Sequence, residues 1–149
     1  MDDSHPKLDV NTELASRRTG MSFQRTRLSA DRTLMSVIRT SLSLIGFGFT
    51  IFQFFQRLRE QDVIKKAASA RNFGLTLVAL GVVMLILGIV YHVQFMMGLR
   101  RLREEMAKEG LIHGESGFPL SLTLIVAFIL LLIGLAAIVS MAFQVGPFG

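Results

Sequence analysis

The sequence predicts an all-α integral membrane protein with three transmembrane helices and a basic amphipathic helix on the N-terminal side of the first span. Two observations predict this fold. Of the 149 residues 51% are hydrophobic, and the mean hydropathy is +0.51. The charged residues are gathered in blocks that leave residues 40–56, 72–99 and 116–149 without Lys, Arg, Asp or Glu. Since a helix needs about 20 largely apolar residues to cross a bilayer, we expect one span in each stretch.

A seven-residue phrase that begins with Arg-Thr occurs four times in tandem between residues 18 and 45. The copies read RTGMSFQ, RTRLSAD, RTLMSVI and RTSLSLI. Because seven residues make almost two turns of an α-helix, each copy stacks on the previous one with a drift of about 20°. The repeat therefore predicts one helix with a face of Arg, Ser and Thr.

This polar face continues beyond the repeat at alternating intervals of four and three residues. Its members are Arg39, Ser43, Gly46, Thr50, Gln53 and Arg57. Such spacing keeps side chains on one side of a helix. A coiled coil would need two apolar positions per heptad among a polar majority, whereas the third and fourth copies are apolar nearly everywhere off this face. We therefore expect a helix that passes from water into lipid with one polar side.

The expected segments follow from these patterns. They are a disordered tail (1–10), a basic heptad-repeat helix (11–38), transmembrane helix 1 (39–57), a connection (58–71), transmembrane helix 2 (72–98), a charged cytoplasmic helix with its loop (99–119) and transmembrane helix 3 (120–144). The heptad-repeat helix either continues straight into the first span or bends from it near residues 31–36. Gly74, Gly81 and Gly88, seven residues apart, predict close packing of the second span against a neighbouring helix.

Positive charge is distributed unequally between the two sides of the membrane. Of the 16 Lys and Arg residues, seven precede the first span, five lie in the first connection and four in the second. With three spans the N-terminus and the second connection share a side, so eleven basic residues stand opposite five. The positive-inside rule then predicts a multi-pass protein with its N-terminus in the cytoplasm and its C-terminus outside.

The arginine face predicts contact with anions. Arginine stays protonated at membrane depth and must find an anion, a dipole or water. If several copies pack the first span around a shared axis, each Arg becomes a ring of the kind that selects anions in pores, and guanidinium groups suit phosphate oxygens. The candidate anion-binding or pore-lining residues are Arg18, Arg25, Arg32, Ser36, Arg39, Ser43, Thr50, Gln53 and Arg57, with Asp31 as a charge partner.

A second interpretation needs no conduit. A basic amphipathic helix before a span often binds anionic lipid headgroups, which would make the protein a membrane-anchored scaffold or a lipid-binding accessory module. The Ser and Thr hydroxyls would then bond to carbonyls of their own helix or to a neighbouring helix. In either case the bilayer is a partner, and nucleic acid is not.

Catalysis is not expected. His5, His92 and His113 are scattered, cysteine is absent, and no nucleophile stands beside a base. We therefore predict neither an enzyme nor a bound metal or cofactor, and we expect His92, near the end of the second span, to be a packing residue.

Residues 28–49, LSADRTLMSVIRTSLSLIGFGF, resemble the signature of the YidH-type family of small bacterial membrane proteins, a domain of unknown function. The pattern is an acid or amide followed by Arg-Thr, a second Arg-Thr and a span that contains Gly. Here it begins at Asp31 and Arg32, continues at Arg39 and reaches Gly46, with Val37 in place of the usual Trp. The resemblance implies a bacterial inner (plasma) membrane protein.

The same domain resembles the membrane part of the vacuolar transporter chaperone, the eukaryotic polyphosphate polymerase complex, whose membrane subunits form a pentameric conduit lined by basic rings. The resemblance places Arg25 and Arg32 where that complex has basic residues on its pore-facing first helix, and Asp31 where it has an acid. Polymerase activity belongs there to a separate soluble domain. The resemblance thus implies a channel-like or accessory role for a homo-oligomer, expected to be a pentamer, that binds or conducts phosphate or polyphosphate.

Overall fold

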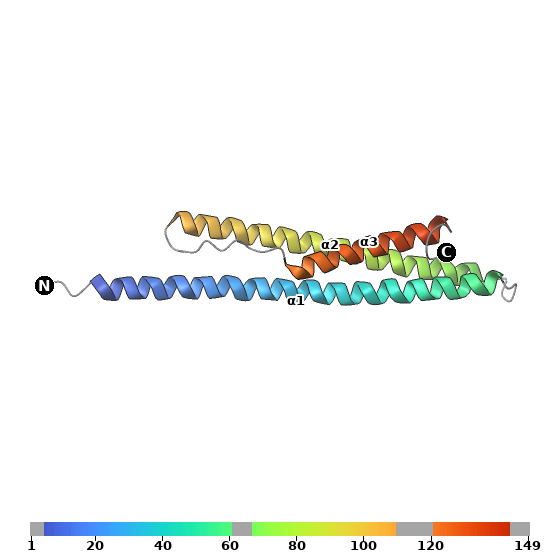
Figure 1. Cartoon of the computed structure of the whole chain (residues 1–149), viewed down its shortest axis with the longest axis horizontal. Coiled ribbons are helices and arrows are strands. Elements are labelled where there is room, and N and C mark those ends of the chain that lie inside the picture. Colours follow the sequence, from blue (N-terminus) through green and yellow to red (C-terminus); the bar gives the residue numbers. More distant parts are fainter. Residues whose placement is uncertain (1–4, 61–66, 110–120, 144–149) are drawn as a thin grey trace. The chain divides into compact units, whose positions relative to one another are not determined.

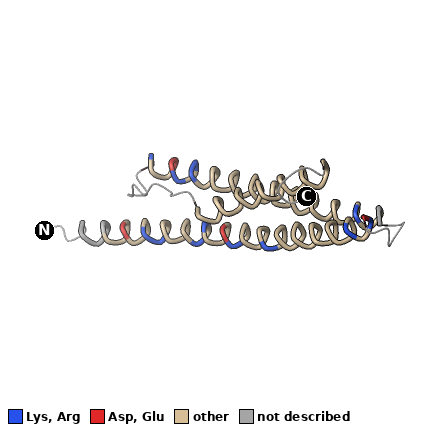
Figure 2. Tube along the Cα trace, turned by 45° about the vertical axis from the view of Figure 1, so that its right-hand side comes forward, with Lys and Arg blue, Asp and Glu red and all other residues tan. Residues whose placement is uncertain are grey.

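The computed structural model describes residues 5–60, 67–109 and 121–143. Within these ranges the chain forms three α-helices, α1 (His5–Glu60), α2 (Ala67–Lys108) and α3 (Leu122–Phe143) (Figure 1). Each is long and apolar enough to cross a membrane, which confirms the all-α, three-span fold. Figure 2 shows the charged residues on α1 and α2, whereas α3 carries none.

The chain divides into two compact units. The first consists of Met1–Arg32 and Tyr91–Pro119, so its described part is the N-terminal portion of α1 and the C-terminal portion of α2. The second consists of Thr33–Val90 and Leu120–Gly149 and contains the rest of both helices together with α3. Within the second unit α1 and α3 run in the same direction and α2 runs antiparallel to them (Figure 1).

The start of α1 differs from the predicted segments. The helix begins at His5, inside the expected disordered tail (1–10), so this expectation was wrong for residues 5–10. Pro6 lies in the first turn of α1. A proline is tolerated there because the first helical N–H groups have no intrahelical acceptor.

The segments around the second span also differ. The expected connection (58–71) is shortened from both ends, because α1 continues to Glu60 and α2 begins at Ala67. α2 then runs to Lys108, so the expected transmembrane helix 2 and the charged helix after it are one element. Backbone chemistry, not the membrane surface, ends a helix, and Gly98 alone does not interrupt this one. The loop expected after it lies mostly outside the described residues.

Two apolar clusters hold the second unit together, and each contains side chains from α1, α2 and α3. One cluster consists of Leu34, Ile38, Leu85, Ala127 and Leu130, and the other of Ile45, Phe52, Val78, Val82 and Met141. The α1 members recur at helical spacing, so a single face of α1 is buried against α2 and α3.

The backbones of α1 and α2 come into contact at two glycines. A Cβ atom on Gly48 would lie 2.6 Å from the carbonyl oxygen of Gly74, and one on Gly74 would lie 2.7 Å from that of Gly48. Further along α2, a Cβ on Gly81 would lie 3.0 Å from the carbonyl oxygen of Ser41, and one on Gly88 would meet the side chain of Val37. The predicted glycine packing face of the second span is therefore confirmed.

Gly48→Ala is expected to lower the free energy of unfolding in detergent by about 1–3 kcal/mol, because the added methyl group forces α1 and α2 apart. Gly46→Ala is the matched control, since a Cβ at Gly46 meets nothing within 4 Å, and it should cause no loss. Circular dichroism during titration with a denaturing detergent measures both. Equal stability of the two variants would contradict the glycine contact.

Candidate functional site: the polar face of α1

The residues predicted from the sequence to bind anions lie on one face of α1, which we call the arginine stripe. The stripe consists of Arg18, Arg25, Arg32, Ser36, Arg39, Ser43, Thr50, Gln53 and Arg57. The side chain of Gln53 is half-buried, and the other eight residues are exposed. Arg18, Arg25 and Arg32 belong to the first unit and the rest to the second.

Within the second unit the stripe points away from the core. At about 100° per residue, the middle of the stripe lies roughly 150° around α1 from the middle of the face that contains Leu34 and Phe52. That face is buried against α2 and α3, with exposed fractions of 2% for Leu34 and 4% for Phe52. Packing of α1 against α2 and α3 therefore leaves the stripe exposed in this unit.

Hydroxyl groups along this side of α1 are bonded to their own helix. The Ser43 hydroxyl donates to the carbonyl oxygen of Arg39 at 2.9 Å, and that of Thr50 donates to the carbonyl oxygen of Gly46 at 2.9 Å. Thr19, Thr26 and Thr40 donate in the same way to the residue four positions earlier. Such bonds satisfy a hydroxyl proton in an apolar environment, so these groups do not by themselves require water.

Large apolar side chains flank the stripe on both sides. Phe47 and Phe54, with exposed fractions of 63% and 58%, lie on one side, and Met35 and Leu42, with 40% and 53%, lie on the other. The outer face of α1 in the second unit is thus polar along its middle and apolar along its edges. A helix surrounded only by lipid would be expected to expose apolar side chains all round.

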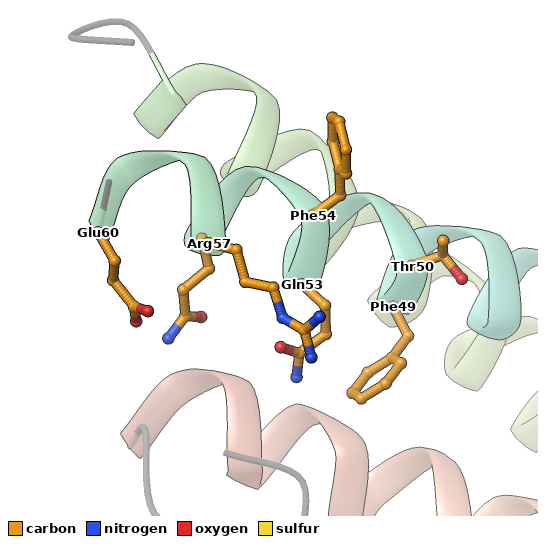
Figure 3. Close-up of a pocket in the computed structure, with 7 residues that line it drawn as sticks. Phe49, Thr50, Gln53, Phe54, Arg57 and Glu60 are labelled. Atoms are coloured by element: carbon orange, nitrogen blue, oxygen red, sulfur yellow. The ribbon is translucent and has the colours of Figure 1, made fainter. Parts of the chain in front are cut away.

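The structure brings the last part of the stripe together in a groove at the end of α1. The groove has a volume of about 620 Å³ and is lined by Phe49, Thr50, Gln53, Phe54, Gln56, Arg57 and Glu60. Figure 3 shows the side chains of Phe49, Gln53, Arg57 and Glu60 directed to the same side of α1, where the ribbon of α3 passes, while Phe54 points away. The groove thus combines one aromatic ring, two amides, a guanidinium group and a carboxylate.

Asp31, predicted as a charge partner of arginine, contacts His92, for which only a packing role is expected from the sequence. Its Oδ1 lies 3.6 Å from Nε2 of His92 within the first unit, a distance too long for a hydrogen bond but within ion-pair range if the imidazole is protonated. His92 is only 3% exposed, and the Asp31 side chain is 23% exposed. Oδ1 of Asp31 and Nδ1 of His92 are both buried without a hydrogen-bond partner.

A signal in the sequence could have found this contact. Asp31 lies seventeen residues before Gly48, and His92 lies eighteen residues after Gly74. In an antiparallel helix pair, a residue a given number of positions before a contact on one helix faces the residue about the same number of positions after that contact on the other helix. His92 is also the only ionisable side chain other than Tyr91 in the uncharged stretch 72–99, and a buried polar group in such a stretch calls for a partner.

Residues 25–98 match the family model described as "Domain of unknown function (DUF202)". The chain contains a DUF202 domain. This confirms the resemblance to the YidH-type membrane proteins. No curated protein and no solved structure gives a significant match to the chain.

The DUF202 domain contains most of the candidate site. It covers the stripe from Arg25 to Arg57 and both Asp31 and His92, whereas Arg18 and α3 lie outside the matched residues. The description of the DUF202 family assigns no activity. What the site does must therefore be inferred from its geometry and charge.

A double-mutant cycle should detect the contact between Asp31 and His92. With Asp31→Asn, His92→Gln and the combined variant, we expect a coupling free energy of about 0.5–3 kcal/mol, because the two groups are in contact and largely desolvated. Glu13 and Arg17 provide the control, since they form an exposed ion pair at 2.6 Å whose coupling should stay near 0.3–0.5 kcal/mol. Denaturation in detergent micelles supplies the free energies, and a cycle at Asp31 no stronger than this control would contradict the buried contact.

Proposed function

We propose that this protein is an oligomeric, channel-like membrane protein without enzymatic activity, which binds or conducts phosphate-bearing anions along the arginine stripe. The observation that supports this proposal is the position of the stripe. α1 packs its apolar face onto α2 and α3 and leaves its polar face exposed. Exposure of polar groups to lipid is unfavourable, and contact with water or with further copies of α1 removes that cost.

The flanks of the stripe fit a ring of α1 helices. In a closed ring of about five helices, each helix meets its neighbours at roughly 50–60° on either side of the direction to the axis. Phe47 and Phe54 lie roughly 50–70° to one side of the middle of the stripe, and Met35 and Leu42 lie at similar angles on the other side. These exposed apolar side chains would become buried between neighbours while the stripe faced the axis. The flanks thus favour a homo-oligomer, and the vacuolar transporter chaperone resemblance favours a pentamer.

Charge favours an anion as the ligand. Among the described residues, the structure gives none of the five stripe arginines an ion pair with an acidic side chain. In a ring each guanidinium would be repeated in every subunit, so bound anions would relieve the repulsion. Successive arginines of the heptad repeat are about 10 Å apart along the helix axis, and a guanidinium group binds two phosphate oxygens at once. A polyphosphate chain could therefore contact several rings.

The distribution of charge supports an orientation for this conduit. The N-terminus and the second connection together hold eleven of the sixteen basic residues, which favours the cytoplasm for both and the outside for the C-terminus. A bacterial inner membrane is the proposed location, which the resemblance to the YidH-type bacterial membrane proteins supports. Anions in the cytoplasm would then meet Arg18, Arg25 and Arg32 before they reach the span.

A second function is favoured by the hydroxyl groups. Because Ser43 and Thr50 donate to carbonyls of their own helix, the middle of the stripe can tolerate an apolar neighbour. The arginines at both ends of the stripe would then bind anionic lipid headgroups. The protein would act as a membrane-anchored scaffold or lipid-binding accessory module without a conduit. Two experiments separate these functions.

The first experiment labels single cysteines with a charged, membrane-impermeant thiol reagent. In a conduit, Thr50→Cys should react because its side chain faces water. Leu132→Cys is the control, since Leu132 is 53% exposed on α3 and should face lipid in either case. Protection of both positions, with and without added polyphosphate, would contradict a water-filled path along the stripe.

The second experiment measures efflux of radiolabelled phosphate from proteoliposomes. Arg39→Gln should leave the oligomer intact but reduce efflux about tenfold or more, because each ring loses the charge that concentrates anions. Arg39→Lys keeps the charge and should retain most of the efflux, and Arg59→Gln controls for removal of an exposed arginine off the stripe. Absence of protein-dependent efflux in the wild type, together with weakened binding of Arg39→Gln to anionic vesicles, would favour the scaffold.

A further inference from the structure

The groove at the end of α1 changes from apolar to charged along its length. Its lining runs from Phe49 and Thr50 to Arg57 and Glu60, which corresponds to about 15 Å along the helix axis. The stretch 40–56 contains no charged residue, and Arg57 is the first one after it. The groove therefore crosses the boundary between the hydrocarbon core and the headgroup region. A phospholipid changes from its apolar acyl chains to its charged headgroup at the same depth.

The volume of the groove is suitable for part of a lipid. At about 620 Å³ it falls within the usual range of about 300–1,000 Å³ for small-molecule sites. The aromatic ring of Phe49 lies at the end nearer the membrane centre, on the same side of α1 as the charged groups (Figure 3). A headgroup with its glycerol and the first part of an acyl chain could be accommodated in this order.

The charged end of the groove carries both signs. Arg57 and Glu60 are three positions apart on one helix, where side chains are neighbours, and both are exposed. No ion pair joins them in the described part of the chain. A guanidinium group binds phosphate oxygens, and a carboxylate binds an ammonium group. An anionic headgroup would match only Arg57, whereas a zwitterionic one matches both.

The amides favour a primary amine over a quaternary one. Gln53 and Gln56 line the same groove, and their carbonyl oxygens can accept hydrogen bonds from N–H donors. A primary ammonium group has three such donors, as the side chain of lysine does, whereas a trimethylated one has none. We infer that this groove binds a phospholipid with a phosphoethanolamine headgroup, with Arg57 on the phosphate and Glu60 on the ammonium group.

Native mass spectrometry of the detergent-solubilised protein tests this inference. The probes are phosphatidylethanolamine, phosphatidylcholine and phosphatidylglycerol with identical acyl chains. Wild-type protein should retain phosphatidylethanolamine about tenfold better than the other two. Arg57→Gln should lower its retention about tenfold, and Glu60→Gln should abolish the preference over phosphatidylglycerol while retaining binding through the phosphate.

Arg59→Gln is the matched control. Arg59 is exposed and close to Arg57 in the chain, but it does not line the groove, so its loss should leave lipid retention unchanged. Equal retention of the three lipids, a preference for phosphatidylglycerol, or equal effects of Arg57→Gln and Arg59→Gln would overturn the inference. If Arg57→Gln does not elute like the wild type in size-exclusion chromatography, Glu60→Gln still tests the inference independently.

The lipid site shares Thr50, Gln53 and Arg57 with the arginine stripe, but it can be tested separately from the conduit. Arg39 lies outside the groove, so Arg39→Gln should reduce phosphate efflux while leaving the lipid preference in place. Loss of efflux without any lipid preference in the wild type would leave the conduit standing and overturn the lipid site. A lipid preference in the wild type without any phosphate efflux would support the lipid site and contradict the conduit.

Discussion

The second unit depends on the backbone contact between Gly48 of α1 and Gly74 of α2. In lipid, two apolar helices gain no hydrophobic free energy by associating, so close packing and van der Waals contact must supply the attraction. Once Gly48 faces α2, the helical period determines the direction of every other α1 side chain in this unit. Leu34 and Phe52 turn inward, and Arg39 and Thr50 turn outward. The glycine contact thus determines both the core and the exposure of the polar face.

Arg57 belongs to both the arginine stripe and the groove, so the two proposals would give it two roles. In the stripe it is the first charge after the uncharged stretch 40–56, and in the groove it lies three positions before Glu60. A guanidinium group that holds a headgroup phosphate has fewer donors free for a second anion. Occupation of the groove would therefore weaken anion binding at this end of the stripe, whereas Arg39 would be unaffected.

Much of the second unit could be predicted from the sequence, because its determinants are periodic. The spacing of Gly74, Gly81 and Gly88 predicted the packing face, and the repeat predicted that its arginines share one side of a helix. Helix ends were predicted less well, since α2 continues beyond the apolar stretch and only backbone chemistry stops it. The partner of Asp31 was missed because His92 lies on another helix, and a contact between helices depends on their register. The groove was missed for a different reason: its lining residues all lie on α1, but the hollow between them depends on side-chain conformations that no motif specifies.

If anions pass along the arginine stripe, as proposed, the hydrogen bonds of Ser43 and Thr50 would affect their passage. A hydroxyl that gives its proton to a helix carbonyl turns its lone pairs outward, so it presents partial negative charge to whatever lies beside it. Between Arg39 and Arg57, over about 27 Å of helix, the surface would thus attract water hydrogens and repel bare anions. In the proposed conduit, an anion crossing this section would have to turn each hydroxyl round at the cost of about one hydrogen bond, or about 1 kcal/mol. The two ends would set how strongly ions are held, and the hydroxyls would set how fast they pass.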